Sequence, residues 1–177
     1  RCMNEYDSLG FYNGGPEAGA SQPHKHLQLV PLPLAPQGPP VPIAPLLPAA
    51  RETVGSGTIP GFDFVHAFAV LGAAADERAA AREAFERYAT MLARVGLHLP
   101  PGSGSDLQGG PYNLVATREW LLLVPRSREH FDSISINALG FAGALLVWNE
   151  EQLRALRAAG PLTALRETAL PLRSTGR

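Results

Sequence analysis

Hydrophobic and polar positions alternate with a helical period in one long segment. Between Asp76 and about Val95, apolar residues recur three or four positions apart, with Arg and Glu between them. The apolar positions are Ala81, Ala84, Phe85, Tyr88, Met91, Leu92 and Val95. Gly96 follows the last of them. This pattern predicts an amphipathic helix that ends at the glycine.

A shorter segment near the end of the chain predicts a second helix, from Glu150 to Ala159. Asn149 can cap its start, Gln152 stands at the third helical position, and Gly160 follows the run. A capping side chain, a polar residue three positions later and a closing glycine are typical of a complete short helix. We expect it to be the last helix of the chain.

Short apolar runs bounded by turn residues predict two pairs of strands. Leu9 to Tyr12 and Leu27 to Leu32 flank a glycine-rich stretch. Tyr112 to Ala116 and Trp120 to Val124 flank the polar residues 117–119, and the second of these runs is apolar at every position. The latter pair predicts a hairpin whose second strand is buried on both faces.

Proline separates the first pair of strands from the rest of the chain. Nine of the seventeen prolines lie between Pro31 and Pro60. Proline lacks a backbone N–H and disrupts helices, so we expect this segment to be an extended crossing between two parts of the molecule.

Composition excludes several classes of protein. The chain has 177 residues, of which 45% are hydrophobic, and a net charge of −1 with no basic block, so a core is expected but no nucleic-acid surface. The single cysteine excludes an internal disulfide and a cysteine-based zinc cluster. Neither a signal peptide nor an apolar run of membrane-spanning length is present, which predicts a cytoplasmic protein without a membrane partner. The oligomeric state is left open.

Two histidines and a glutamine alternate just after the glycine-rich stretch. On an extended chain His24, His26 and Gln28 project to one side, whereas Lys25 and Leu27 project to the other. Two imidazoles in this arrangement are compatible with exposed or buried structural histidines, or with a shared zinc ion.

The residues before the histidines favour a different use. Gly14, Gly15, Gly19, Ala20 and Ser21 have little side-chain bulk, so backbone N–H groups and the Ser21 hydroxyl can converge on phosphate oxygens. An imidazole nitrogen beside such a loop can attack phosphorus and carry a nucleotidyl group as a phosphoramidate. The combination predicts nucleotidyl transfer.

These residues carry a resemblance to a known family. The stretch "YNGGPEAGASQPHKHLQ" resembles the active-site segment of the ATP adenylyltransferases, or diadenosine tetraphosphate phosphorylases, a transferase branch of the histidine-triad (HIT) superfamily. The stretches "PYNLVATREWLLLVPRSREHF" and "ISINALGFAGALLVWNEEQL" resemble the C-terminal region of the same family. Together they cover well over half of the chain.

The resemblance implies an α+β fold, with a HIT-like antiparallel sheet and flanking helices packed on one side. Residues 1–60 would hold the C-terminal part of the catalytic domain with the proline-rich crossing, and residues 61–177 the ATP adenylyltransferase C-terminal region. Family members are longer, so we expect the sheet to be incomplete at its N-terminus and a substrate-binding lysine to lie outside this sequence.

The resemblance also implies roles for individual residues. His26 would be the nucleophile, His24 would orient it, and Gln28 would bind an oxygen of the transferred phosphoryl group. The expected nucleotide contacts are Asn13, Gly19, Ala20, Ser21 and Gln22, with further substrate contacts from Asn113 and Arg118. Arg118 and Arg126 are equally well explained as structural charges at the ends of the hairpin.

The reaction so implied is reversible phosphorolysis of diadenosine tetraphosphate. Phosphate and the dinucleotide would give ADP and ATP through an adenylyl-histidine, with Mg²⁺ accompanying the polyphosphate. Zinc is not expected, because the chain offers no cysteine pair. Two other functions are compatible with the same residues, a non-catalytic nucleotide-binding remnant and a sugar-nucleotide transferase or phosphorylase of the same superfamily.

Overall fold

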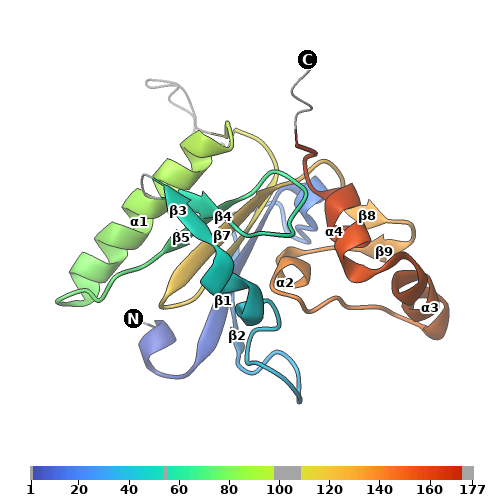
Figure 1. Cartoon of the computed structure of the whole chain (residues 1–177), viewed down its shortest axis with the longest axis horizontal. Helices are drawn as coiled ribbons and strands as arrows, with labels where there is room; N and C mark the ends of the chain where they lie inside the picture. Colours follow the sequence, from blue (N-terminus) through green and yellow to red (C-terminus); the bar gives the residue numbers. More distant parts are fainter. Residues whose placement is uncertain (1, 54–55, 98–108, 173–177) are drawn as a thin grey trace.

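The computed structural model describes residues 2–53, 56–97 and 109–172, which form a layer of strands covered by helices (Figure 1). Seven strands make one antiparallel sheet in the order β2-β1-β6-β7-β5-β4-β3. Their bounds are β1 Ser8–Gly14, β2 Leu27–Pro31, β3 Arg51–Thr53, β4 Ser56–Thr58, β5 Ala67–Val70, β6 Tyr112–Ala116 and β7 Trp120–Pro125. A separate pair is formed by β8 His130–Phe131 and β9 Ile134–Ser135. The main sheet therefore takes strands from both of the ranges 1–60 and 61–177.

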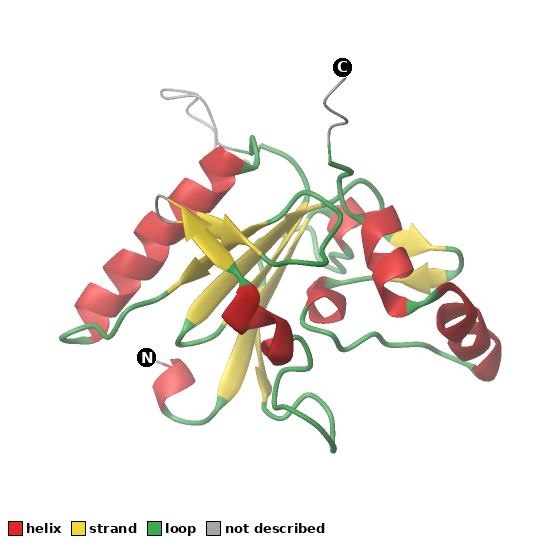
Figure 2. Ribbon diagram, in the orientation of Figure 1, coloured by secondary structure: helices red, strands yellow, loops and turns green. Residues whose placement is uncertain are grey.

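Helices lie on both faces of the sheet, as Figure 2 shows. The α-helices are α1 Glu77–Arg94, α2 Ala138–Phe141, α3 Glu150–Ala159 and α4 Pro161–Thr168, and the 3₁₀ helices are η1 Cys2–Asn4, η2 Pro16–Ala18 and η3 Ala44–Ala49. On one face α1 packs through Met91 against apolar residues of β5 and β7. On the other face α2, α3 and α4 contribute to the larger core cluster. The expectation of helices on one side only was wrong, whereas the antiparallel α+β class is confirmed.

The predicted hairpin forms the centre of the sheet. All six residues of β7 are buried, because β6 and β5 flank it and helices cover both of its faces. The turn at residues 117–119 is closed by Thr117, whose Oγ1 accepts hydrogen bonds from the N–H groups of Glu119 and Trp120, both at 3.1 Å. The prediction of a hairpin whose second strand is apolar on both faces is thus confirmed.

Both predicted helices begin at capping side chains. In α1 the Asp76 carboxylate accepts from the N–H of Ala79 at 2.8 Å, and before α3 the side-chain oxygen Oδ1 of Asn149 accepts from the N–H of Gln152 at 2.9 Å. Each bond satisfies an N–H that the first turn of a helix leaves without an internal partner. The bounds expected from sequence are confirmed to within a residue.

Two proline-containing segments differ from expectation. The crossing after β2 contains η3, a 3₁₀ helix with proline near its start and Pro48 inside it, so the segment is not extended throughout. After α3, Pro161 starts α4, so α3 is not the last helix. Proline is tolerated at the first helical position because no intrahelical N–H is needed there.

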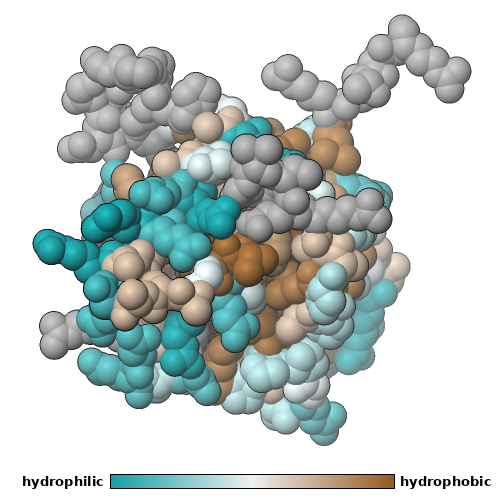
Figure 3. Space-filling model, turned by 60° about the vertical axis from the view of Figure 1, so that its left-hand side comes forward, coloured by the Kyte–Doolittle hydropathy of each residue, from teal (hydrophilic) through white to brown (hydrophobic). Residues whose placement is uncertain are grey.

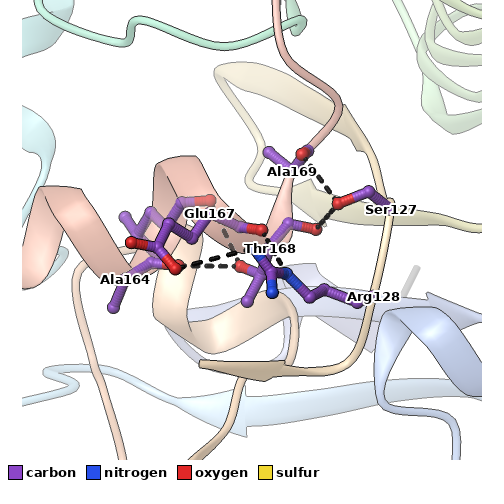
Figure 4. Close-up of polar contacts among 7 residues, drawn as sticks. Ser127, Arg128, Ala164, Glu167, Thr168 and Ala169 are labelled. Atoms are coloured by element: carbon purple, nitrogen blue, oxygen red, sulfur yellow. Dashed lines mark hydrogen bonds and ion pairs between the residues drawn. The ribbon is translucent and has the colours of Figure 1, made fainter. Parts of the chain in front are cut away.

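The end of α4 is tied to the chain that leaves β7 (Figure 4). The Ser127 hydroxyl donates to the carbonyl oxygens of Thr168 at 3.3 Å and Ala169 at 3.0 Å, and Nε of Arg128 donates to the Glu167 carbonyl oxygen at 2.7 Å. These bonds use carbonyl groups that the last turn of a helix leaves free of internal partners. They hold the last described helix against the end of β7.

The surface is mixed in character. On the side where α1 comes forward, hydrophilic side chains cover the left of the view and hydrophobic ones form a band beside them (Figure 3). Within the described ranges, no helix combines the length and the apolar character needed to span a bilayer.

Candidate functional site

The two motif histidines lie side by side just before β2. Nδ1 of His26 is 3.4 Å from Nε2 of His24, and their ring centroids are 5.6 Å apart. Both side chains are exposed, which leaves them accessible to a ligand. The prediction that the alternation brings the two imidazoles together is confirmed, although they precede the strand and only Gln28 lies within it.

A cavity of about 430 Å³ opens beside the histidines. This size is typical of pockets that bind small molecules. It is lined by Tyr12, Asn13, Gly15, Pro16, Ala20, Ser21, Gln22, Pro23, His24 and Lys25. A smaller hollow of about 10 Å³ joins Asn13, Ala20, Ser21 and Gln22 to His24, His26 and Gln28. The structure thus gathers most of the residues predicted from the motif, from Asn13 to Gln28, around one space.

Glycine allows the loop before the histidines to approach the rest of the protein. Gly19 has φ of +78°, and a Cβ at this position would lie 3.1 Å from the Ile136 carbonyl oxygen and 3.3 Å from Cβ of Asn137. Other residue types are therefore strained here by both backbone conformation and space. Gly19 holds the loop against the segment that precedes α2.

Asn13 and Asn113 connect this loop to the sheet. They are directly opposite each other on β1 and β6 and share one face of the sheet. Nδ2 of Asn113 donates to Oδ1 of Asn13 at 2.8 Å and to the Ala18 carbonyl oxygen at 2.9 Å. Oδ1 of Asn13 also accepts from the N–H of Ala138 at 2.9 Å. Loop, sheet and α2 meet at these two carboxamides.

Arg126 completes this support from below the surface. It is 2% exposed, and its five N–H groups have five oxygen acceptors. One acceptor is Oδ1 of Asn113, and the other four are the carbonyl oxygens of Arg128, Glu129, Ile136 and Thr168. The guanidinium carbon also lies 5.2 Å from the centroid of the Phe141 ring. Burial lowers the pKa of Arg126 to about 10, so the side chain remains charged at neutral pH.

Two residues predicted to contact substrate lie elsewhere. Asn113 is fully buried, and its Nδ2 hydrogens and Oδ1 are occupied by Asn13, Ala18 and Arg126, so it supports the site from within. Arg118 lies in the turn after β6, and this turn is next to the start of β1. It forms an ion pair with Asp7 there. Asn13 is near the other end of β1. The structure does not bring Arg118 to the histidines.

Tyr112 and Tyr88 pack behind Tyr12, which lines the cavity. The rings of Tyr12 and Tyr112 have centroids 5.5 Å apart, and the hydroxyl oxygens of Tyr112 and Tyr88 are 2.6 Å apart. Burial, followed by the hydrogen bond to Tyr88, raises the pKa of Tyr112. Tyr112 therefore stays protonated at neutral pH and adds no negative charge behind the cavity.

Sequence reasoning missed some of the residues that shape the site. Tyr12, Pro16 and Pro23 line the cavity, and Ala138 supplies a backbone N–H to Asn13. A signal for the last contact was available, because Asn137 is a capping residue and does cap α2 through the N–H of Leu139 at 3.0 Å. Within the part of the chain that the structure describes, no cluster of three metal-binding side chains (His, Cys, Asp or Glu) is found.

Comparisons with known proteins identify the family of the chain. The model of the ATP adenylyltransferase C-terminal domain matches residues 60–171, and that of the Ap4A phosphorylase N-terminal domain matches residues 1–49. Two proteins of Saccharomyces cerevisiae are similar in sequence. Protein APA1 is 29% identical over 80% of this chain and 45% of its own length. Diadenosine 5',5'''-P1,P4-tetraphosphate phosphorylase 2 is 27% identical over 84% of this chain and 47% of its own length.

Solved structures of yeast Ap4A phosphorylase Apa2 share the fold. One superposes with a TM-score of 0.71 at 24% identity, covering 96% of this chain and 58% of Apa2. The complex of Apa2 with Ap4A gives a TM-score of 0.65 at 23% identity, covering 94% of this chain and 56% of Apa2. This chain spans about half the length of the curated relatives it matches. Since the first family model covers more than half of the sequence and the second covers most of the remainder, the chain belongs to the ATP adenylyltransferase and Ap4A phosphorylase family.

Proposed function

We propose that this chain carries the nucleotidyl-transfer centre of a diadenosine tetraphosphate phosphorylase, with His26 as the nucleophile. The observation that carries the proposal is the placement of paired imidazoles, 3.4 Å apart, beside a cavity of about 430 Å³ walled by the glycine-containing loop. Support also comes from the relatives, because Apa2 has been solved in complex with Ap4A and with AMP.

The paired histidines suit covalent catalysis. If Nδ1 of His26 carries its proton and directs it at Nε2 of His24, Nε2 of His26 keeps a lone pair for attack. His24 then orients the nucleophile without itself meeting phosphorus. This division of roles matches the triad logic of a nucleophile held by a neighbouring group.

Transfer would occur in two displacements. Nε2 of His26 attacks an α-phosphorus, a P–N bond forms, and the P–O bond to the polyphosphate breaks, so that ATP leaves. An oxygen of inorganic phosphate then attacks the same phosphorus, the P–N bond breaks, and ADP leaves with Nε2 restored. Donors from the loop backbone, Ser21 and Gln28 would stabilise the charge that develops on the phosphoryl oxygens.

The polyphosphate chain itself would bring a divalent cation such as Mg²⁺. Mg²⁺ is usually held by substrate phosphates with one or two protein carboxylates, rather than by a complete protein cage.

The proposal is tested by incubating the protein with diadenosine tetraphosphate radiolabelled at its α-phosphates. We expect acid-labile label on the protein, ATP released with it, and ADP formed only when phosphate is added. His26→Ala should abolish the label and His24→Ala should reduce it. The matched control is His130→Ala, an exposed histidine on β8, which should leave labelling unchanged.

The outcomes separate the candidate functions. Nucleotide binding without label at His26 would contradict the enzyme and identify a non-catalytic binding protein. Label from a sugar nucleotide but not from the dinucleotide would place the chain with the sugar-nucleotide transferases of the superfamily.

Gln28 distinguishes a transferase from a hydrolase. An amide has no titration near pH 7, so it cannot activate water as a histidine can. We expect Gln28→His to shift products from ADP plus ATP toward AMP plus ATP, as measured by chromatography of reactions run with and without phosphate. If the unaltered protein already releases AMP equally fast with and without phosphate, the phosphorylase assignment is wrong.

A further inference from the structure

We infer that Arg126 is a positioning residue: acting through Asn113, it turns the carboxamide of Asn13 so that its NH2 group, rather than its oxygen, faces the nucleotide cavity. The inference rests on the proposed function only for the identity of the ligand in that cavity, a nucleotide. The orientation of Asn13 follows from hydrogen bonds within the protein.

The chemistry of arginine fixes the orientation of Asn113. A guanidinium has five N–H donors and no acceptor, so the atom of Asn113 that meets Arg126 has to be the oxygen. The Nδ2 group of Asn113 is then on the other side of its amide. Its two hydrogens are directed at Oδ1 of Asn13, 2.8 Å away, and at the carbonyl oxygen of Ala18, 2.9 Å away.

Two converging donors in turn fix the orientation of Asn13. Nδ2 of Asn113 and the N–H of Ala138 point at the same atom of Asn13 from 2.8 and 2.9 Å. Only an oxygen can accept both, so Oδ1 faces β6 and α2. β2 lies on the other side of β1 from β6, and the motif histidines precede it. The Nδ2 group of Asn13 is thereby turned toward the histidines and the loop, with which Asn13 lines both hollows.

The orientation of the Asn13 carboxamide matters because nucleotides present phosphate oxygens, which accept hydrogen bonds. An NH2 group facing them donates to an anion, whereas a carbonyl oxygen in the same place would repel it. Hydrogen bonds to charged groups are the stronger class. Arg126 thus determines whether Asn13 presents a hydrogen-bond donor or an acceptor to the cavity, although Arg126 does not contact the cavity itself.

Arg126 is well placed to hold this arrangement against change. Its remaining four N–H groups bind main-chain oxygens from the segment after β7, from the residue before Asn137 and from the end of α4. The neighbouring residues Ser127 and Arg128 bind the same end of α4 (Figure 4). The guanidinium therefore cannot turn away from Asn113 without breaking bonds to three other segments.

The first experiment needs no nucleotide. Hydrogen exchange of side-chain carboxamides is followed by NMR in the full chain. We expect slow exchange for the NH2 group of Asn113, whose hydrogens are both bonded inside the protein, and fast exchange for that of Asn13. Protection of Asn13 in the unaltered protein would overturn the inference, whatever the protein binds.

Asn113→Asp reverses the orientation at the middle of the relay. The introduced carboxylate would still accept from Arg126 but would present a second oxygen to Asn13, and a charge-assisted hydrogen bond is about twice as strong as a neutral one. The carboxamide of Asn13 should turn over, its NH2 exchange should slow, and the Kd for AMP should rise at least tenfold. Unchanged exchange at Asn13 together with unchanged AMP affinity would contradict the relay.

Arg126→Lys is the conservative variant and Arg128→Ala the matched control. Lysine can still donate to Asn113 but cannot serve five acceptors. We expect a lower Tm but an AMP affinity within about threefold for the folded protein, the opposite of the Asn113→Asp pattern. Arg128→Ala removes a neighbouring exposed arginine and should leave Asn13 exchange as it is. Loss of stability and affinity in parallel across both relay variants would show that Arg126 is structural only.

The two levels of the hypothesis fail separately. If the exchange pattern is as expected but AMP does not bind the unaltered protein, the proposed function is wrong and the orientation of Asn13 stands. If AMP binds and His26 is labelled while Asn13 is protected from exchange, the proposed function stands and the orientation of Asn13 is wrong.

Discussion

Two arginines at opposite ends of the β6–β7 hairpin show how differently the same residue type is used. Arg118, in the turn, is largely exposed and pairs with the exposed carboxylate of Asp7. Arg126, just after β7, is buried and its five donors are all bonded, yet none of its acceptors is a carboxylate. At the turn, the charge of Arg118 is paired with an opposite charge on the exposed surface. At the other end of the hairpin, the charge of Arg126 is hydrogen-bonded to five neutral oxygen atoms inside the protein.

The difference has an energetic basis. Exposed ion pairs contribute about 0–1 kcal/mol, because water screens them and both side chains lose freedom. A buried cation is costly unless every donor is bonded, but once bonded it is equally costly to remove, because its acceptors lose their partner. The site end of the hairpin should therefore respond strongly to substitution and the turn end weakly.

The largest expected effect is that of Arg126→Ala. It removes the side-chain donor from Asn113 Oδ1 and from four main-chain oxygens, of which those of Glu129 and Thr168 keep a backbone N–H donor. We expect the free energy of unfolding to fall by about 3 kcal/mol or more. Urea unfolding followed by circular dichroism measures this. A loss below about 1 kcal/mol would remove the contrast between the two ends.

Gly19→Val should have the next largest effect, also at the site end. The added side chain meets the Ile136 carbonyl oxygen, and the residue has a positive φ that valine adopts poorly. We expect a loss of about 2 kcal/mol, with weaker AMP binding because the loop is displaced. The control is Gly38→Val in the proline-rich crossing, which also has a positive φ but open space around it. Equal losses in the two variants would show that backbone conformation alone, and not the close approach, matters at Gly19.

His66 is a second buried basic side chain whose pKa is lowered by burial, as is that of Arg126. Its Nε2 accepts from the N–H of Ile59 at 2.7 Å, and Nδ1 is 2.8 Å from the Phe64 carbonyl oxygen, so the neutral ring satisfies both. Desolvation lowers its pKa below the unfolded value of 6.5. The unfolded state therefore binds the proton more readily, and the stabilisation is complete above about pH 6.5 and lost as the pH falls toward the folded pKa.

The measurement is the midpoint of urea unfolding at pH 7.5 and at pH 5.5 for the unaltered protein and His66→Gln. One proton contributes a slope of at most about 1.4 kcal/mol per pH unit. Glutamine can accept from Ile59 but does not titrate, so we expect the variant to lose less stability on acidification. Identical pH profiles would exclude His66 as the source.

The smallest expected effect belongs to the turn. Arg118→Ala removes the pairing with Asp7 and should change the free energy of unfolding by no more than about 0.5 kcal/mol. Added salt should reduce even this difference. AMP affinity should not change, because the turn lies at the other end of the strands from Asn13. A clear loss of affinity would restore Arg118 as a substrate contact.

Local patterns in the sequence predicted much of the fold. The period of α1, the cap Asn149 and the apolar run of β7 were all predicted correctly, because each depends on residues within a few positions of one another. Very short strands such as β3 and β4, and the four-residue helix α2, leave too few positions for a period to show.

In the candidate site too, local sequence patterns were predictive and long-range contacts were not. His24, His26 and the loop were found because the motif is contiguous. The role of Arg126 was not, because an arginine after a strand is exposed or buried according to what covers it, and here the cover is α4 and the segment before α2. Asn113 was assigned to substrate because its position in the motif does not reveal that three partners occupy it.

The hydrogen bonds that support the loop also determine when it can fold. They join Asn13, Asn113, Ala138, Arg126 and Thr168. They link residues 42, 100 and 125 positions apart, so the loop beside the histidines cannot settle until the chain as far as α4 has been synthesised and folded. Contacts of such long range slow folding, because the chain loses entropy in closing each loop before the contact is gained. The candidate site should therefore be among the last parts of this chain to fold, although its histidines precede most of the residues that support it.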